Sequence, residues 1–228
     1  LVGAVAAYTN CEATIQYDAK GLSVIDKRPA VPNYKTTKAA EAEQAIKLVL
    51  DHFQMDLDKM QVKLTFGGTL TCASGIGASA AQVVSLARAL KYELPKELSE
   101  DEINVAGYEG EKGYHGTPSG IDNTAATFGG LLKFQRTDSD PIFEKIQIKN
   151  PIRIVYASTG ITSSTTTVVG DVRAKKEADP AWFDNLLESY KSLVAKAETA
   201  VLANDMELIG KLMNENHVLL QQLTVSCK

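Results

Sequence analysis

The chain contains, at residues 115–124, the stretch His115-Gly116-Thr117-Pro118-Ser119-Gly120-Ile121-Asp122-Asn123-Thr124. Pro118 is typical of a turn and Ser119 of a helix start. Asp122 therefore falls in the first turn of a predicted helix, where the helix dipole stabilises a carboxylate. Two interpretations follow: a base presented at the start of a helix, or an acid that only stabilises that helix.

A second glycine-rich turn lies upstream, at Ser74-Gly75-Ile76-Gly77-Ala78-Ser79-Ala80-Ala81. Gly75 and Gly77 permit positive φ angles and close backbone approach. The residues that follow have the apolar spacing of one helical face, at Ala80, Val83, Val84, Ala87 and Leu90. A glycine-rich turn that opens a helix directs backbone N–H groups at an anion, and the hydroxyl of Ser79 is placed to bind phosphate-bound Mg²⁺. No Gly-Lys-Ser/Thr ending is present, so this is not the common P-loop, and a tight turn packing a helix on a sheet is the alternative.

A capping-box pattern at Ser99-Glu100-Asp101-Glu102 predicts the start of another helix. Its inward residues are expected to be Ile103, Ala106 and Val105, and it carries Glu109 and Glu111 towards the 115–124 turn. Glu111 is therefore predicted to lie near Asp122. The alternative is an exposed acid paired with Lys112. Together the two turns suggest phosphoryl transfer to a small hydroxyl-bearing molecule.

Both motifs, in this order, resemble those of the GHMP kinases, the family of galactokinase, homoserine kinase, mevalonate kinase and phosphomevalonate kinase. Residues 111–123 are similar to the mevalonate kinase branch, and residues 74–79 to its trypanosomatid-type members. The resemblance covers nearly the whole chain, including Ala157-Ser158-Thr159-Gly160 and the segment after Asp179.

The resemblance implies a role for each matching residue. The ATP phosphates would be wrapped by Gly75, Ile76, Gly77, Ala78 and Ser79. Mg²⁺ would be held between the β- and γ-phosphates by Ser79 and Glu111. The C5 hydroxyl of mevalonate would face Asp122, within a substrate motif that includes Ser119 and Gly120. Thr165, in the run of residues 162–167, matches a hydroxyl near the substrate pocket.

The same resemblance implies an α+β architecture of two domains with the active site in the cleft between them. Residues 1–148 would form an ATP-binding domain like ribosomal protein S5 domain 2, and residues 149–228 a ferredoxin-like domain. The implied reaction converts ATP and mevalonate to ADP and 5-phosphomevalonate, an early step towards isoprenoids and sterols. Prenyl diphosphates that occupy the ATP site are implied inhibitors, and a homodimer is an implied assembly.

The chain also departs from the family pattern. Cys72 replaces the usual Pro before the phosphate turn, and Ala78 replaces the first Ser of a Ser-Ser pair, but neither change removes a group that the chemistry needs. Family members begin with a segment that carries a Lys beside the catalytic Asp, and end with a third glycine-rich motif. Because this sequence runs from Leu1 to Lys228 without them, it is predicted to be the middle of such a kinase. A GHMP kinase acting on phosphomevalonate, galactose or homoserine and a non-catalytic nucleotide-binding protein remain as alternatives.

Composition and charge argue against several classes of protein. The net charge of −4 argues against a nucleic-acid or anionic-membrane surface, and no apolar run approaches a membrane span. The three cysteines, Cys11, Cys72 and Cys227, are widely spaced, which argues against a disulfide framework or zinc site and favours a reducing compartment such as the cytoplasm.

The pattern of apolar residues predicts the remaining elements. Strands are expected at residues 2–8, 11–17, 22–25, 61–66, 131–134 and 152–157. Helices are expected at residues 37–53, 181–202 and 205–223, and a domain boundary at residues 137–151. The last two helices are expected to pack as a hairpin through Leu186, Leu193, Ala197 and Val201 on one and Leu208, Leu212, Leu219 and Leu223 on the other.

Overall fold

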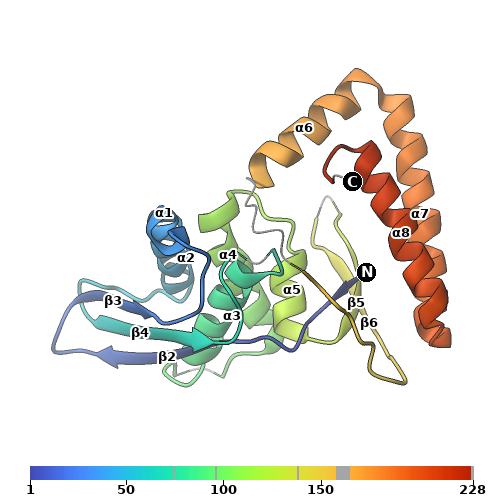
Figure 1. Ribbon diagram of the computed structural model, residues 1–228. Helices are drawn as coiled ribbons and strands as arrows, with labels where there is room; N and C mark the ends of the chain where they lie inside the picture. Colours follow the sequence, from blue (N-terminus) through green and yellow to red (C-terminus); the bar gives the residue numbers. More distant parts are fainter. Residues whose placement is uncertain (74, 96, 138, 158–164, 227–228) are drawn as a thin grey trace. The chain divides into compact units, whose positions relative to one another are not determined.

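The computed structural model describes the chain except for residues 74, 96, 138, 158–164 and 227–228 (Figure 1). The chain divides into two compact units, residues 2–144 and residues 145–228 together with Leu1. The strands are β1 (Val2–Gly3), β2 (Thr9–Gln16), β3 (Gly21–Asp26), β4 (Gln61–Gly68), β5 (Leu131–Gln135) and β6 (Ile142–Ile146). The helices are α1 (Tyr34–Thr37), α2 (Ala39–His52), α3 (Ala78–Leu90), α4 (Glu100–His115), α5 (Ile121–Phe128), α6 (Thr165–Ala178), α7 (Pro180–Ala203) and α8 (Met206–Gln222).

The first unit contains two three-stranded sheets, in the orders β2-β4-β3 and β1-β5-β6. β4 pairs antiparallel with β2, with Thr9 opposite Gly68, and parallel with β3, with Gly21 opposite Gln61. Helices α2, α3 and α4 lie on one side of the β2-β4-β3 sheet (Figure 1). Their apolar faces form one core with alternate residues of β4, and the fully buried members include Val62, Leu64, Phe66, Val49, Val83 and Ile103.

The local helix signals of the sequence are confirmed. All five apolar residues predicted for the inner face of α3 are buried. The Ser99 hydroxyl accepts a hydrogen bond from Glu102 N (3.2 Å) while the Glu102 carboxylate accepts from Ser99 N (2.9 Å), so the capping box is complete. Ile103 and Ala106 point inward as predicted, but the prediction for Val105 is wrong. Its side chain is 50% exposed because it lies on the opposite face of the helix.

Three glycines on one face of α4 bring this helix unusually close to its neighbours. A Cβ atom at Gly113 would lie 2.4 Å from the backbone nitrogen of Ala45 in α2, and one at Gly110 would lie 2.7 Å from Val83 Cβ in α3. Gly107 faces Val84 at a similar distance. Close packing therefore holds the C-terminal end of α4, which carries Glu111, against the start of α3.

Two strand predictions are wrong. The predicted strand at residues 2–8 stops at Gly3, because β1 pairs with β5 whereas β2 pairs with β4, and residues 4–8 cross from one sheet to the other. Residues 152–157 form no strand; they are mostly exposed, and no pairing partner lies among the described residues. β6 lies within residues 137–151, where the sequence predicted a domain boundary and no strand, and α6 was not predicted.

In the second unit, α7 and α8 pack against each other through Leu193, Ala197, Ala200, Leu212 and Leu219. The hairpin prediction is therefore confirmed. Leu208 is exposed, however, and Ile209 takes the inward position. Within the described part of the chain, no helix combines the length and apolar character that a bilayer crossing requires.

Candidate active site

The glycine-rich turn that leads into α3, called the phosphate turn below, contains residues with left-handed backbone conformations. Ala73, Gly75 and Gly77 have φ angles of 64°, 73° and 73°. Gly77 is the N-cap of α3, and it has no side chain with which to cap the helix. The free N–H groups of the first turn are consequently available to an anionic ligand, and the helix dipole favours one there.

Ser79, in the first turn of α3, faces the C-terminal end of α4. Its Oγ lies 3.4 Å from His115 Nε2, and the same nitrogen lies 3.8 Å from Glu111 Oε2. The Ser79 hydroxyl is also close enough to Glu111 to lower the pKa of that carboxyl. The phosphate turn and the acidic end of α4 are thus one cluster of side chains.

Glu111 is almost completely buried, with 2% of its surface exposed. Burial, helped by the charge of Asp122, raises its pKa to about 7, although the nearby Ser79 hydroxyl acts to lower it. Pairing with Lys112, the alternative considered for Glu111, does not occur, because Lys112 binds both carboxylate oxygens of Glu109 at 2.7 Å. Burial of this carboxylate at the end of a helix indicates a site rather than a surface ion pair.

One oxygen of Glu111 makes this cluster suitable for a cation. Glu111 Oε1 is buried and has no hydrogen-bond partner among the described residues. Carboxylate and hydroxyl oxygens are ligands of Mg²⁺, which commonly takes one or two from the protein and the rest from phosphates and water. No group of three or more His, Cys, Asp or Glu side chains in the described part of the chain forms a metal cage. Glu111 and Ser79 therefore fit a cation that arrives with a phosphate ligand.

Asp122 stands beside the phosphate turn. It is the second residue of α5, whose N-cap, Gly120, has a φ of 86°, and Ser119 Oγ accepts a hydrogen bond from Ile121 N at 3.3 Å. A Cβ atom at Gly77 would lie 3.9 Å from Asp122 Cγ. The Asp122 side chain keeps an exposed edge, yet the surrounding protein raises its pKa, while His115 lowers it. The Asp122 carboxylate therefore lies next to the phosphate turn and is also accessible to solvent.

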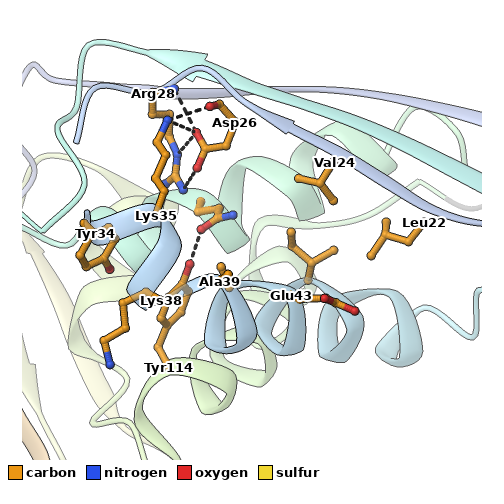
Figure 2. Close-up of a pocket in the computed structure, with 13 residues that line it drawn as sticks. Leu22, Val24, Asp26, Arg28, Tyr34, Lys35, Lys38, Ala39, Glu43 and Tyr114 are labelled. Carbon is orange, nitrogen blue, oxygen red and sulfur yellow. Dashed lines mark hydrogen bonds and ion pairs between the residues drawn. The ribbon is translucent and has the colours of Figure 1, made fainter. Parts of the chain in front are cut away.

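A pocket of about 340 Å³ lies between β3 and α2 (Figure 2). Its walls are apolar at Leu22, Val24 and Ile46 and charged at Lys35 and Lys38. At one end it is lined by four polar residues, of which Arg28 and Gln82 are buried and Asp26 and Tyr114 are partly buried. Ser79, Glu111 and Asp122 do not line it. None of the four polar residues was selected from the sequence, although the Asp26-Lys27-Arg28 tripeptide that ends a strand was a visible signal.

Thr165 stays a prediction. It begins α6 in the second unit, and its side chain lies outside the described residues. Residues 158–160 of the Ala157–Gly160 match also lie outside them.

Comparison with known proteins places this geometry in a family. Residues 40–130 match the GHMP kinases N terminal domain. The fold resembles the crystal structure of L. major mevalonate kinase in complex with R-mevalonate, with a TM-score of 0.89 and 40% identity, over 99% of this chain and 69% of that one. The mevalonate kinase of Pyrococcus furiosus is 33% identical over 200 residues, or 84% of this chain. The Methanococcus jannaschii enzyme, at 22% identity and a TM-score of 0.65, shares the fold.

The chain thus has the mixed α and β fold of the GHMP kinases. Within that group, it belongs to the mevalonate kinase family. It spans 58% of the length of the P. furiosus relative.

Proposed function

We propose that the full-length protein transfers the γ-phosphoryl group of ATP to the C5 hydroxyl of mevalonate, giving 5-phosphomevalonate and ADP. The observation that carries the proposal is the 40% identity, over 99% of this chain, to a kinase crystallised with R-mevalonate. The juxtaposition of a glycine-rich turn at a helix start, the buried Glu111 beside Ser79, and the Asp122 carboxylate supports it.

Positioning and charge neutralisation supply most of the catalysis in phosphoryl transfer. In the proposal, N–H groups of residues 75–79 hold the ATP phosphates at the start of α3, and Ser79 and Glu111 supply oxygen ligands to Mg²⁺. Bound Mg²⁺ would neutralise charge on the β- and γ-phosphates. It would also give Glu111 Oε1 the partner that the described residues do not provide.

Asp122 has the role of proton acceptor. The alcohol oxygen forms a bond to the γ-phosphorus as the bond from that phosphorus to the bridging oxygen breaks, and the alcohol proton passes to the Asp122 carboxylate. Burial raises the pKa of Asp122, which makes its carboxylate a stronger base than that of an ordinary aspartate.

The remaining parts of the proposal concern the whole protein. Residues 1–148 belong to the ATP-binding domain and residues 149–228 to the C-terminal domain, whose Thr165 hydroxyl contributes to the substrate pocket. The protein works in the cytoplasm as a homodimer, and prenyl diphosphates compete with ATP. Each of these statements is supported by the family to which the chain belongs.

A substrate panel tests the proposal. The full-length protein is incubated with MgATP and mevalonate, phosphomevalonate, galactose or homoserine, and ADP release is measured. We expect release with mevalonate to exceed release with the other three. If another alcohol gives the fastest ADP release, that alcohol is the substrate and the mevalonate assignment is wrong. If the protein binds nucleotide but releases no ADP with any of the four alcohols, it is not a kinase for them.

A further inference from the structure

Arg28 is a buried arginine that the proposed chemistry does not use. It follows β3 by two residues and is 4% exposed. Its Nε and Nη2 donate to the two carboxylate oxygens of Asp26 at 3.0 and 2.8 Å, and its backbone N–H donates to the same carboxylate at 3.0 Å. Figure 2 shows this fork at the end of the pocket. Lys35 Nζ adds a hydrogen bond to the Asp26 carbonyl at 2.7 Å.

The remaining arm of the guanidinium reaches the phosphate turn. Arg28 Nη1 donates to the carbonyl oxygen of Ala78, the first residue of α3, at 3.3 Å. The next residue, Pro29, accepts a hydrogen bond from Cys72 N at 2.8 Å, and Ala30 forms an isolated bridge with Cys72. Residues 28–30 therefore hold both ends of the segment from Cys72 to Ala78.

The same group of polar residues connects α3 to α4. Tyr114 Oη donates to Gln82 Oε1 at 2.5 Å, and Gln82 is 1% exposed. Arg28 also acts on Tyr114, since the nearby guanidinium lowers the pKa of the phenol that burial raises. Tyr114 immediately precedes His115 and lies one helical turn from Glu111. A change in the position of Arg28 would therefore shift both Ser79, in α3, and Glu111, in α4.

A paired and buried arginine is suited to hold geometry. Its planar fork fixes direction as well as distance, which the flexible ammonium of lysine does not. The Phe66 ring lies 5.5 Å from the guanidinium carbon and limits its movement further. Removing one partner of such a network leaves the others buried and unsatisfied.

We propose that Arg28 is a positioning residue that fixes the backbone on the two sides of the phosphate turn, at Cys72 and at Ala78, and aligns Ser79 with Glu111. It acts through the Ala78 carbonyl and does not touch substrate. The consequence for ATP binding rests on the proposed kinase function. The consequence for the turn itself does not, so the two can be tested separately.

The experiment compares Arg28→Met and Arg28→Lys with the unsubstituted full-length protein by hydrogen exchange and MgATP binding. The reporting amides are Cys72 and Ala81, which donate to Pro29 O and Gly77 O at 2.8 and 2.9 Å. We expect exchange at both to accelerate about tenfold in Arg28→Met, while core amides of α2 and β4 keep their rates. The Kd for MgATP should rise by about tenfold or more, with a smaller rise in Arg28→Lys.

Arg88→Met is the matched control. Arg88 also joins a carboxylate, Glu100, to a backbone carbonyl, Thr127 O, but it lies at the other end of α3. Its loss should leave Cys72 and Ala81 exchange unchanged. Unchanged exchange in both Arg28 variants, or equal acceleration at every core amide, would overturn the positioning role.

If Arg28→Met does not fold, amide exchange in Arg28→Lys and Tyr114→Phe is compared with that of the unsubstituted protein instead. Local acceleration at Cys72 and Ala81 in either would support the proposal, and unaltered exchange in both would refute it. A protein that shows the exchange effect but never binds MgATP would contradict the kinase proposal and leave the positioning role standing.

Discussion

Gly77 and Asp122 face each other across the site: a Cβ atom at Gly77 would lie 3.9 Å from the Asp122 carboxyl carbon. The N-cap of the phosphate-turn helix α3 is therefore adjacent to the second residue of α5. Gly77 and Asp122 are 45 positions apart in sequence, so two distant turns present an anion site and a carboxylate to the same space. Both helices begin with a left-handed glycine, which lets the backbones approach without a side chain between them.

Replacement of Asp122 by Asn tests the proton acceptor. We expect kcat with mevalonate to fall about 10²- to 10⁴-fold, because the amide cannot accept the alcohol proton, while the Kd for MgATP changes little. Steady-state kinetics and nucleotide titration measure both. The control is Asp101→Asn, which also removes an acid from the first turn of a helix, but at an exposed position of α4. A variant of Asp122 with unchanged kcat would remove this residue from the mechanism.

Replacement of Glu111 by Gln tests the cation site. Because the amide is a weaker ligand than a carboxylate, we expect a higher Mg²⁺ concentration at half-maximal rate, by about tenfold or more. Glu109→Gln, two residues earlier and paired with Lys112, should leave the Mg²⁺ titration unchanged. Superimposable titrations of Glu111→Gln and the unsubstituted protein would be incompatible with the assigned role.

The pH dependence of stability offers a second test of Glu111. Its pKa is raised from 4.5 to about 7 on folding, so the folded protein binds the proton more tightly. In metal-free buffer the free energy of unfolding should fall as pH rises through this window, and stay lower above it. Urea unfolding at pH 5 and pH 8 measures this. Between these two pH values, the free energy of unfolding of the unsubstituted protein should fall by on the order of 2 kcal/mol more than that of Glu111→Gln. Parallel pH dependences would show that this carboxyl is not perturbed.

The glycine face of α4 predicts a strong effect on folding. Gly113→Ala would place a methyl group 2.4 and 2.5 Å from backbone atoms of Ala45, so α2 and α4 must separate. We expect a loss of about 3 kcal/mol in the free energy of unfolding. Gly210→Ala, in α8 with no atom within 4 Å of the new methyl, should instead gain up to about 1 kcal/mol. Urea unfolding compares the two, and equal effects would mean that the close approach of α4 carries no energetic weight.

Local signals in the sequence predicted much of the helical structure. The apolar spacing of residues 80–90 and the Ser99–Glu102 capping box act within one helix, so no distant partner decides them. Strand ends were less predictable, since residues 4–8 and 152–157 have strand-like side chains and their conformation depends on pairing. The glycines at 107, 110 and 113 recur every third residue, a visible sign of close helix packing that was not used.

The candidate site was partly predictable for the same reason. Ser79, Glu111 and Asp122 belong to short motifs whose residues are close in sequence, and the structure brings them together. Arg28 was not found, because its contact with Ala78 spans 50 positions and no local pattern marks it. Burial of Glu111 likewise depends on the packing of α4 against α3, which the sequence alone does not specify.

The most direct measurement is ³¹P and ¹³C NMR of the full-length protein's products from MgATP and (R)-mevalonate. The account predicts a new phosphomonoester resonance, coupled to C5 of the mevalonate skeleton, that grows in step with ADP. No phosphomonoester, or a phosphate on another oxygen, from protein that binds MgATP would contradict it.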